Sequence, residues 1–201
     1  VIASLFFYSA ARAVPTVLSP NDIVIVTANS DSGWSTTACS DSAPGGPNSN
    51  AIDFLLRRDI GAGTVFKVTD GAWTGTALST SAEGIITYTA AADMPAGTVI
   101  RYSDCLYNTG GSGWTRSTPL AGFDTAVTGD TLLVYQGTEA SPSFIYGFGF
   151  RSNSWIASGT PSSNISRIPA VLASVSPAAY LSLGTTTGAR NYQYTTTGNY
   201  G

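Results

Sequence analysis

The chain has 201 residues, no histidine and only 10% charged residues, and its formal net charge is −3. An average soluble domain carries about 25% charged residues, so the polar surface here must come from uncharged side chains. This composition removes the commonest general base and metal ligand, and the nine scattered cations argue against a nucleic-acid partner.

The first 13 residues, VIASLFFYSAARA, allow two interpretations. An apolar stretch followed by Ala-Arg-Ala is typical of a secretory signal peptide and its cleavage site, which would make residues 14–201 a single mature domain. No Met or basic region precedes the stretch, so the segment can instead be a retained N-terminal arm. Such an arm needs a groove on another subunit for its apolar side chains. These side chains are Leu5, Phe6, Phe7 and Tyr8.

Short strand-like runs follow, separated by turn sequences such as PGGPNSN, GAG, GGSG and TGD. Residues 23–27 are apolar at successive positions and predict a central strand covered on both faces. One short helix is predicted at residues 168–174. Further strands are predicted at residues 51–57, 64–69, 85–89, 98–103, 131–136, 144–150, 180–183 and 192–196. The pattern indicates an all-β fold, an antiparallel β-sandwich of about 8–10 short strands with at most one short helix.

Two segments of this chain are alike at nine consecutive positions: AGTVFKVTD at 62–70 and AGTVIRYSD at 96–104. Each begins with a small-residue turn, continues as a strand and ends in a carboxylate. Two copies are too few for a solenoid. We therefore expect the segments to occupy equivalent positions, such as facing strands of two sheets. The alternative is that any two half-buried strands after a glycine turn look alike.

Cys39 and Cys105 lie in loop-like segments rather than in apolar runs, which favours a disulfide formed in an oxidising compartment. By chain-entropy arguments such a bond would stabilise the fold by roughly 4 kcal/mol. Two buried free thiols are the alternative. The sequon at Asn164 lies in a loop-like stretch and is compatible with glycosylation of a secreted protein.

A catalytic site would have to be built without histidine. The base of a hydrolytic triad would fall to Lys67 or to a carboxylate. Asp70 and Asp104, at the ends of the two similar strands, could form a glycosidase-type pair. Caps of strand ends are the favoured interpretation, because Asp accepts bonds from its own downstream amides. We predict no enzyme, no catalytic residue and no cofactor.

The aspartates of the chain are also candidate calcium ligands. The aspartates supply oxygen ligands, and extracellular sandwiches do bind calcium. No D-x-D-x-D-G loop or acidic cluster occurs, however, and residues 29–33 are only a fragment of such a loop. We predict no metal site.

The tryptophans all fall outside the predicted strands, and three of the four precede Ser or Thr. A loop tryptophan beside hydroxyl groups could stack on a sugar ring while the hydroxyls bond it. The favoured alternative is that each ring closes an end of the sandwich, since Trp is buried on average. The four residues are Trp34, Trp73, Trp114 and Trp155.

Several motifs recur together along most of the chain. DFLLRRDI at 53–60 precedes GAGTVFKVTDGAW at 61–73, and EGIITYT at 83–89, GDTLLVYQG at 129–137 and LSLG at 181–184 follow. This series resembles a β-sandwich module of large secreted and surface proteins of bacteria and some algae, with its I-x-A-G-T-x-I-x-F-T-D-x-x-W hairpin. The resemblance implies fold and location but no activity. The cysteine pair and the long 31–50 loop depart from it.

The leading hypothesis is a secreted, non-catalytic structural protein that builds a surface layer, sheath or filament as a homo-oligomer or polymer. Few charges mean little repulsion between copies and little to desolvate on contact. The alternative is a carbohydrate-binding or adhesive module whose partners are glycans. No membrane span is expected, because no apolar run reaches the roughly 20 residues that a helix needs.

Overall fold

The computed structural model describes residues 14–29, 51–79, 83–103, 113–116, 123, 125, 129–150, 155–162, 165–183 and 191–193. They form an all-β fold with one short helix, which confirms the predicted fold class. Within this part of the chain there are twelve strands rather than about 8–10, because three very short ones carry no recognisable period.

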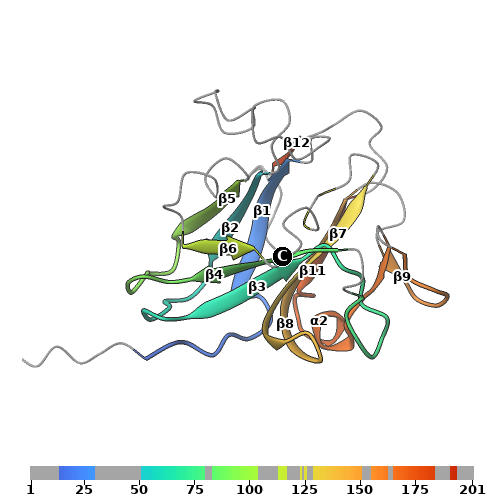
Figure 1. Cartoon of the computed structure of the whole chain (residues 1–201), viewed down its shortest axis with the longest axis horizontal. Coiled ribbons are helices and arrows are strands. Elements are labelled where there is room, and N and C mark those ends of the chain that lie inside the picture. Colours follow the sequence, from blue (N-terminus) through green and yellow to red (C-terminus); the bar gives the residue numbers. More distant parts are fainter. Residues whose placement is uncertain are drawn as a thin grey trace, which may run out of the picture.

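Two sheets make up the body of the molecule (Figure 1). The four-stranded sheet has the order β12-β1-β2-β5, and the six-stranded sheet has the order β11-β8-β7-β3-β4-β6. The first contains β1 (Ile23–Asn29), β2 (Ala51–Leu56), β5 (Val99–Ser103) and β12 (Asn191–Gln193). The second contains β3 (Val65–Thr69), β4 (Ile85–Thr89), β6 (Trp114–Arg116), β7 (Asp130–Thr138), β8 (Ser141–Phe150) and β11 (Tyr180–Leu183).

Aromatic side chains join the two sheets across the core. Trp114 of β6 is the centre of this cluster, and its ring centroid lies between 5.1 and 5.5 Å from four other rings. These rings belong to Phe54, Phe66, Tyr88 and Tyr102. Such pairs add about 0.5–1.5 kcal/mol each to the free energy of burial. The side chains of β2 and β5 therefore face those of β3, β4 and β6, which is a sandwich.

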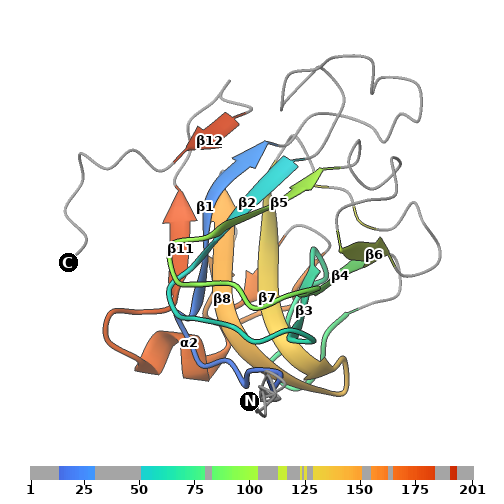
Figure 2. The same ribbon diagram turned by 90° about the vertical axis from the view of Figure 1, so that its left-hand side faces the viewer.

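The two similar segments form matching turns that bond to each other. In each turn a glycine has a positive φ, 81° at Gly63 and 87° at Gly97, as the third position of a type II turn requires. Ile60 and Met94 exchange backbone hydrogen bonds of 2.8 and 2.9 Å. Figure 2 shows the two connections crossing the near end of the sandwich side by side.

Carboxylates complete this exchange. Asp93 Oδ1 accepts a 2.8 Å bond from the amide of Ala62, and Asp59 Oδ1 accepts a 2.8 Å bond from the amide of Ala96. Each turn therefore caps the other. The contact is reciprocal, as in a two-fold symmetric dimer.

The internal symmetry extends well beyond the nine similar positions. The pairing of β2 with β5 is reproduced 34 residues away by the pairing of β4 with β3, so that Phe54 opposite Ile100 corresponds to Tyr88 opposite Phe66. Likewise β6 pairs with β4 where β1 pairs with β2. The predicted equivalence of the two segments is confirmed, with one strand in each sheet.

The structure differs from the sequence-based expectations in three further places. Strand β1 is not covered on both faces, because Ile23 and Ile25 are buried whereas Val24 and Val26 are only half-buried. Strands β8 and β11 pair in parallel, as do two short strands of the outer layer. The helix begins after Pro169 rather than at residue 168.

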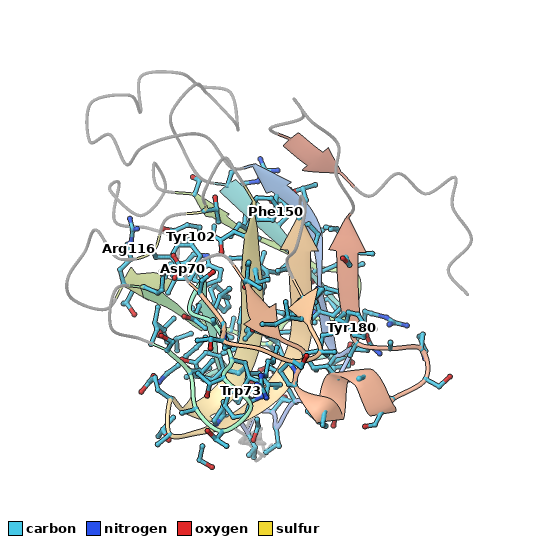
Figure 3. All side chains as sticks on the ribbon, turned by 90° about the vertical axis from the view of Figure 1, so that its right-hand side faces the viewer. Asp70, Trp73, Tyr102, Arg116, Phe150 and Tyr180 are labelled. Carbon is cyan, nitrogen blue, oxygen red and sulfur yellow. The ribbon has the colours of Figure 1, made fainter. Side chains whose placement is uncertain are left out.

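A segment after β8 covers the outer face of the six-stranded sheet (Figure 3). It contains β9 (Trp155–Ile156), β10 (Ser166–Arg167) and α2 (Ala170–Ser174). The Trp155 ring lies against Gly147 of β8, where a Cβ atom would approach Cη2 of the ring to 3.0 Å. This cover explains why residues 144–150 of β8 are buried at every position.

The matched turns allow a paired test of backbone strain. An alanine at either turn glycine is held in the left-handed region, which costs about 1 kcal/mol. At Gly97 the new Cβ meets nothing within 4 Å, whereas at Gly63 it lies 3.2 Å from Cγ of Pro15. Gly63→Ala should therefore lower the free energy of unfolding in urea more than Gly97→Ala does. Equal losses would show that Pro15 yields freely.

Candidate functional site

A strap of residues 14–18 lies against the repeated turns, at the end of the sandwich that faces the viewer in Figure 2. Thr16 bonds to both flanks of the first turn: its amide donates to Thr64 Oγ1 at 2.8 Å, and its Oγ1 accepts from the amide of Gly61 at 3.0 Å. The strap is thus part of the domain, and Leu18 is buried in the core.

Gln136 of β7 ties the strap to the sheet. Its Oε1 accepts from the amide of Leu18 at 2.8 Å, and its Nε2 donates to the carbonyl oxygens of Thr16 and Val65 at 3.1 and 2.7 Å. One amide side chain therefore makes three bonds to strap and strand. The sequence predicts only that Gln136 lies in a strand, because its bonding partners are distant from it in the chain.

Two open hollows flank Thr16. One, of about 420 Å³, is lined by Pro15, Thr16, Val17, Gly63, Val65, Lys67, Gln136 and Gly137. The other, of about 430 Å³, is lined by Thr16, Asp59, Ile60, Gly61, Asp93, Met94 and Pro95. Both hollows are open, and the strap with Thr16 forms the ridge between them.

Exposed valines gather at this end. Val14 and Val17 of the strap are 79% and 83% exposed, and Val65 and Val99, which occupy equivalent positions after the two turns, are 39% and 53% exposed. Among the described residues only Val171 of α2 joins them as an exposed large apolar side chain. Clustered apolar exposure is typical of a contact surface. We call Val14, Val17, Val65 and Val99 the valine end.

The charged side chains of β2 and β5 pair with each other. Asp53 is buried and forms two 2.6 Å bonds with Arg101, and it also accepts a 2.7 Å bond from Thr27 Oγ1. Burial alone would raise the pKa of Asp53, but the bonds from Arg101 and Thr27 outweigh it and lower the pKa below its ordinary value. The pair is a structural ion pair across β2 and β5.

Lys67, the equivalent of Arg101 in the other sheet, has different partners. Lys67 faces Thr87 rather than a carboxylate, and its Nζ instead bonds Glu139 Oε1 at 2.7 Å. This bond from Lys67 is the main cause of the lowered pKa of Glu139. Tyr135 donates to the same oxygen at 3.2 Å, and burial together with the Glu139 charge raises the pKa of Tyr135.

Asp70 caps a backbone amide at the end of β3. It is fully buried at the end of β3, and its Oδ1 accepts a 2.9 Å bond from the amide of Gly84. This bond agrees with the interpretation of strand-end capping. Asp104, the other member of the proposed carboxylate pair, lies outside the described residues.

The tryptophans occupy different environments. Trp114 is 5% exposed and its Nε1 donates to the carbonyl oxygen of Arg101 at 2.9 Å, so the prediction of a sugar-stacking role is wrong for this residue. It faces the core because strand alternation turns it inward beside Tyr88. Trp73 and Trp155 are half-buried, against Phe144 and Gly147.

Several predicted sites lie outside the described residues and stay predictions. They are Cys39 and Cys105 of the disulfide, the glycosylation site Asn164, the ring of Trp34, and Leu5, Phe6, Phe7 and Tyr8 of the arm.

In the part of the chain that is described, no three His, Cys, Asp or Glu side chains gather where they could hold a metal ion. The same residues contain no helix that is long and apolar enough to cross a membrane.

The buried ion pair predicts an acid-sensitive contribution to stability. Because the pKa of Asp53 is lowered in the folded state, its contribution is complete above the unfolded pKa of about 3.9 and is lost as pH falls through the folded value. Asp53→Asn should cost about 1–2 kcal/mol of unfolding free energy at pH 7, a figure reduced by the exposure of Arg101.

The same comparison at pH 2.5, which lies below the unfolded pKa, should show a smaller difference from the wild-type chain. Thr87→Ala, at the equivalent uncharged position, is the matched control and should show the same difference at both pH values. An Asp53→Asn cost that does not change with pH would contradict the assignment.

Comparison of the chain with protein-family models, with curated proteins and with solved structures finds no match. The similarity to secreted surface modules therefore stays a prediction.

Proposed function

We propose that this chain is a non-catalytic structural module that assembles with copies of itself in an extracellular layer, sheath or filament. The observation that carries the proposal is the valine end. There exposed apolar side chains surround the strap, and the apolar residues 1–13 join the domain at Val14. A surface of this kind gains free energy when a second protein surface covers it.

The state of the charged groups supports the same proposal. Two ion pairs lie within the sandwich, one between Asp53 and Arg101 and one between Lys67 and Glu139. The carboxylates of the two turns accept bonds from backbone amides. Copies that meet through the valine end have few charges to desolvate. Assembly through shape and apolar contact requires no titratable site.

The arm can be tested by truncation before Val14. The cut belongs there because Thr16 and Leu18 are bonded into the domain. We expect residues 1–201 to form oligomers or polymers in sedimentation and electron microscopy, and residues 14–201 to form a folded monomer. Val17→Ser should weaken assembly of the full chain, whereas Val171→Ser, an exposed valine on α2, should not.

The outcome that would contradict the proposal is a full chain that stays monomeric at high concentration. Unchanged assembly after truncation would exclude the arm while leaving assembly through the valine end open to the Val17→Ser test.

A glycan-binding module is the second candidate, favoured by the placement of two indoles. The amide of Trp73 donates to Ser166 Oγ at 2.8 Å, and Ser166 pairs with Trp155, so the backbones of both half-buried tryptophans are attached to the same short strand. Partly exposed aromatic rings are the usual platforms for sugar rings.

Under this alternative, Trp73→Ala or Trp155→Ala should abolish binding on a glycan array while near-ultraviolet circular dichroism shows an intact fold. Trp155→Phe, which keeps an aromatic face over Gly147, should retain part of the binding. A wild-type chain that binds no glycan on the array would remove this candidate.

A further inference from the structure

The first of the two hollows at the valine end is lined mainly by apolar side chains and by glycines, which add no side chain. These residues are Pro15, Val17, Gly63, Val65 and Gly137. The charged group of this lining is Lys67, whose ammonium bonds Glu139 at 2.7 Å. The first hollow therefore fits an apolar occupant.

The second hollow carries negative charge. Asp59 and Asp93 line it, and both residues are exposed. One oxygen of each carboxylate accepts an amide bond of 2.8 Å, and the second oxygen has lone pairs of its own. Among the described residues neither carboxylate forms an ion pair. Met94 and Pro95 of the same lining suit the methylene stem of a long cationic side chain.

The N-terminal segment carries the two complementary features. In residues 1–13 the apolar run is residues 5–8, and the one charged side chain is that of Arg12. Residues 7–12 span at most about 17 Å when the chain is extended. The two hollows share Thr16, so this length is enough to cross the strap from one hollow to the other.

The exposure of the valines assigns the occupant to a second copy. Val14 and Val17 are 79% and 83% exposed in the single chain, so the chain by itself leaves this surface uncovered. The segment joins the strap at Val14, so every copy brings one such segment to its own valine end. Exchange of identical segments between copies is a low-cost route to oligomers.

We propose that residues 5–12 of one copy dock on the valine end of a neighbouring copy, with the aromatic residues 6–8 at the first hollow and Arg12 at Asp59 and Asp93 of the second. The apolar contact supplies affinity, and the charged contact fixes the direction of the segment across the strap. The proposal rests on the proposed function, because it names what covers the valine end during assembly.

The full chain with Phe7→p-benzoylphenylalanine tests the apolar contact. Equal amounts of this chain and of an isotope-labelled unmodified chain are mixed before assembly, irradiated with ultraviolet light and mapped by mass spectrometry. We expect crosslinks from residue 7 to the labelled chain at residues 15–17, 63–67 or 136–137, which contain the lining of the first hollow. Crosslinks within one chain, or to any other segment, would overturn the assignment.

A double-mutant cycle in the full chain tests the charged contact. Asp93→Asn removes a charge from the second hollow but keeps an oxygen that accepts from the amide of Ala62. Asp93→Asn and Arg12→Ala should each raise the protein concentration needed for assembly about two- to fivefold at low salt. Together they should raise it by less than the product of the two effects, because each removes one partner of the same contact.

Asp22→Asn is the matched control, since it makes the same change of charge outside the linings of both hollows. Combined with Arg12→Ala it should give the full product of the two separate effects. A full product for Asp93→Asn as well would overturn the charged contact.

Sedimentation of the same samples separates the two proposals. Assembly of the full chain with crosslinks outside the first hollow would overturn the docking assignment and leave the proposed function standing. A full chain that stays monomeric at high concentration would overturn both proposals, because no neighbouring copy then receives the segment.

Discussion

The reciprocal bond between the two repeated turns is the constraint on which the strand arrangement depends. Ile60 and Met94 exchange backbone bonds, and each turn supplies the carboxylate that caps the other. The turns connect β2 to β3 and β4 to β5, each from one sheet to the other, and joined in this way the two connections can meet in only one register. That register continues through both strand pairs, and a slip of one residue would turn Phe54 and Phe66 out of the core.

The two halves are alike in backbone but not in chemistry. Asp53 meets Arg101 across one sheet, whereas Lys67 reaches Glu139 in the other. Strand β3 becomes internal because β7 joins it, whereas β5 is the last of the described strands in its sheet. The repeated backbone therefore carries two different sets of side-chain contacts.

Several of the few charged groups in this chain hold its strands and turns together. Ion pairs and caps hold strands and turns together, and the strap is held by neutral bonds from Thr16 and Gln136. At the exposed end of the sandwich four valines lie beside a few charged side chains, among them Asp59 and Asp93 of the turns. Apolar side chains are inexpensive to desolvate, which is why the proposed contact between copies is placed at the valine end.

The sequence by itself determined the positions of the long strands, the short helix and the equivalence of residues 62–70 and 96–104, because alternation and glycine turns are local properties. Only the tertiary structure decided that the repeat begins at residues 51 and 85, where few side chains agree but the backbone pairing is the same. It also decided the burial of Trp114, the bonds of Gln136 and the existence of β6, β9 and β10. These features depend on partners distant in the chain, and segments of two or three residues are too short to show a period of their own.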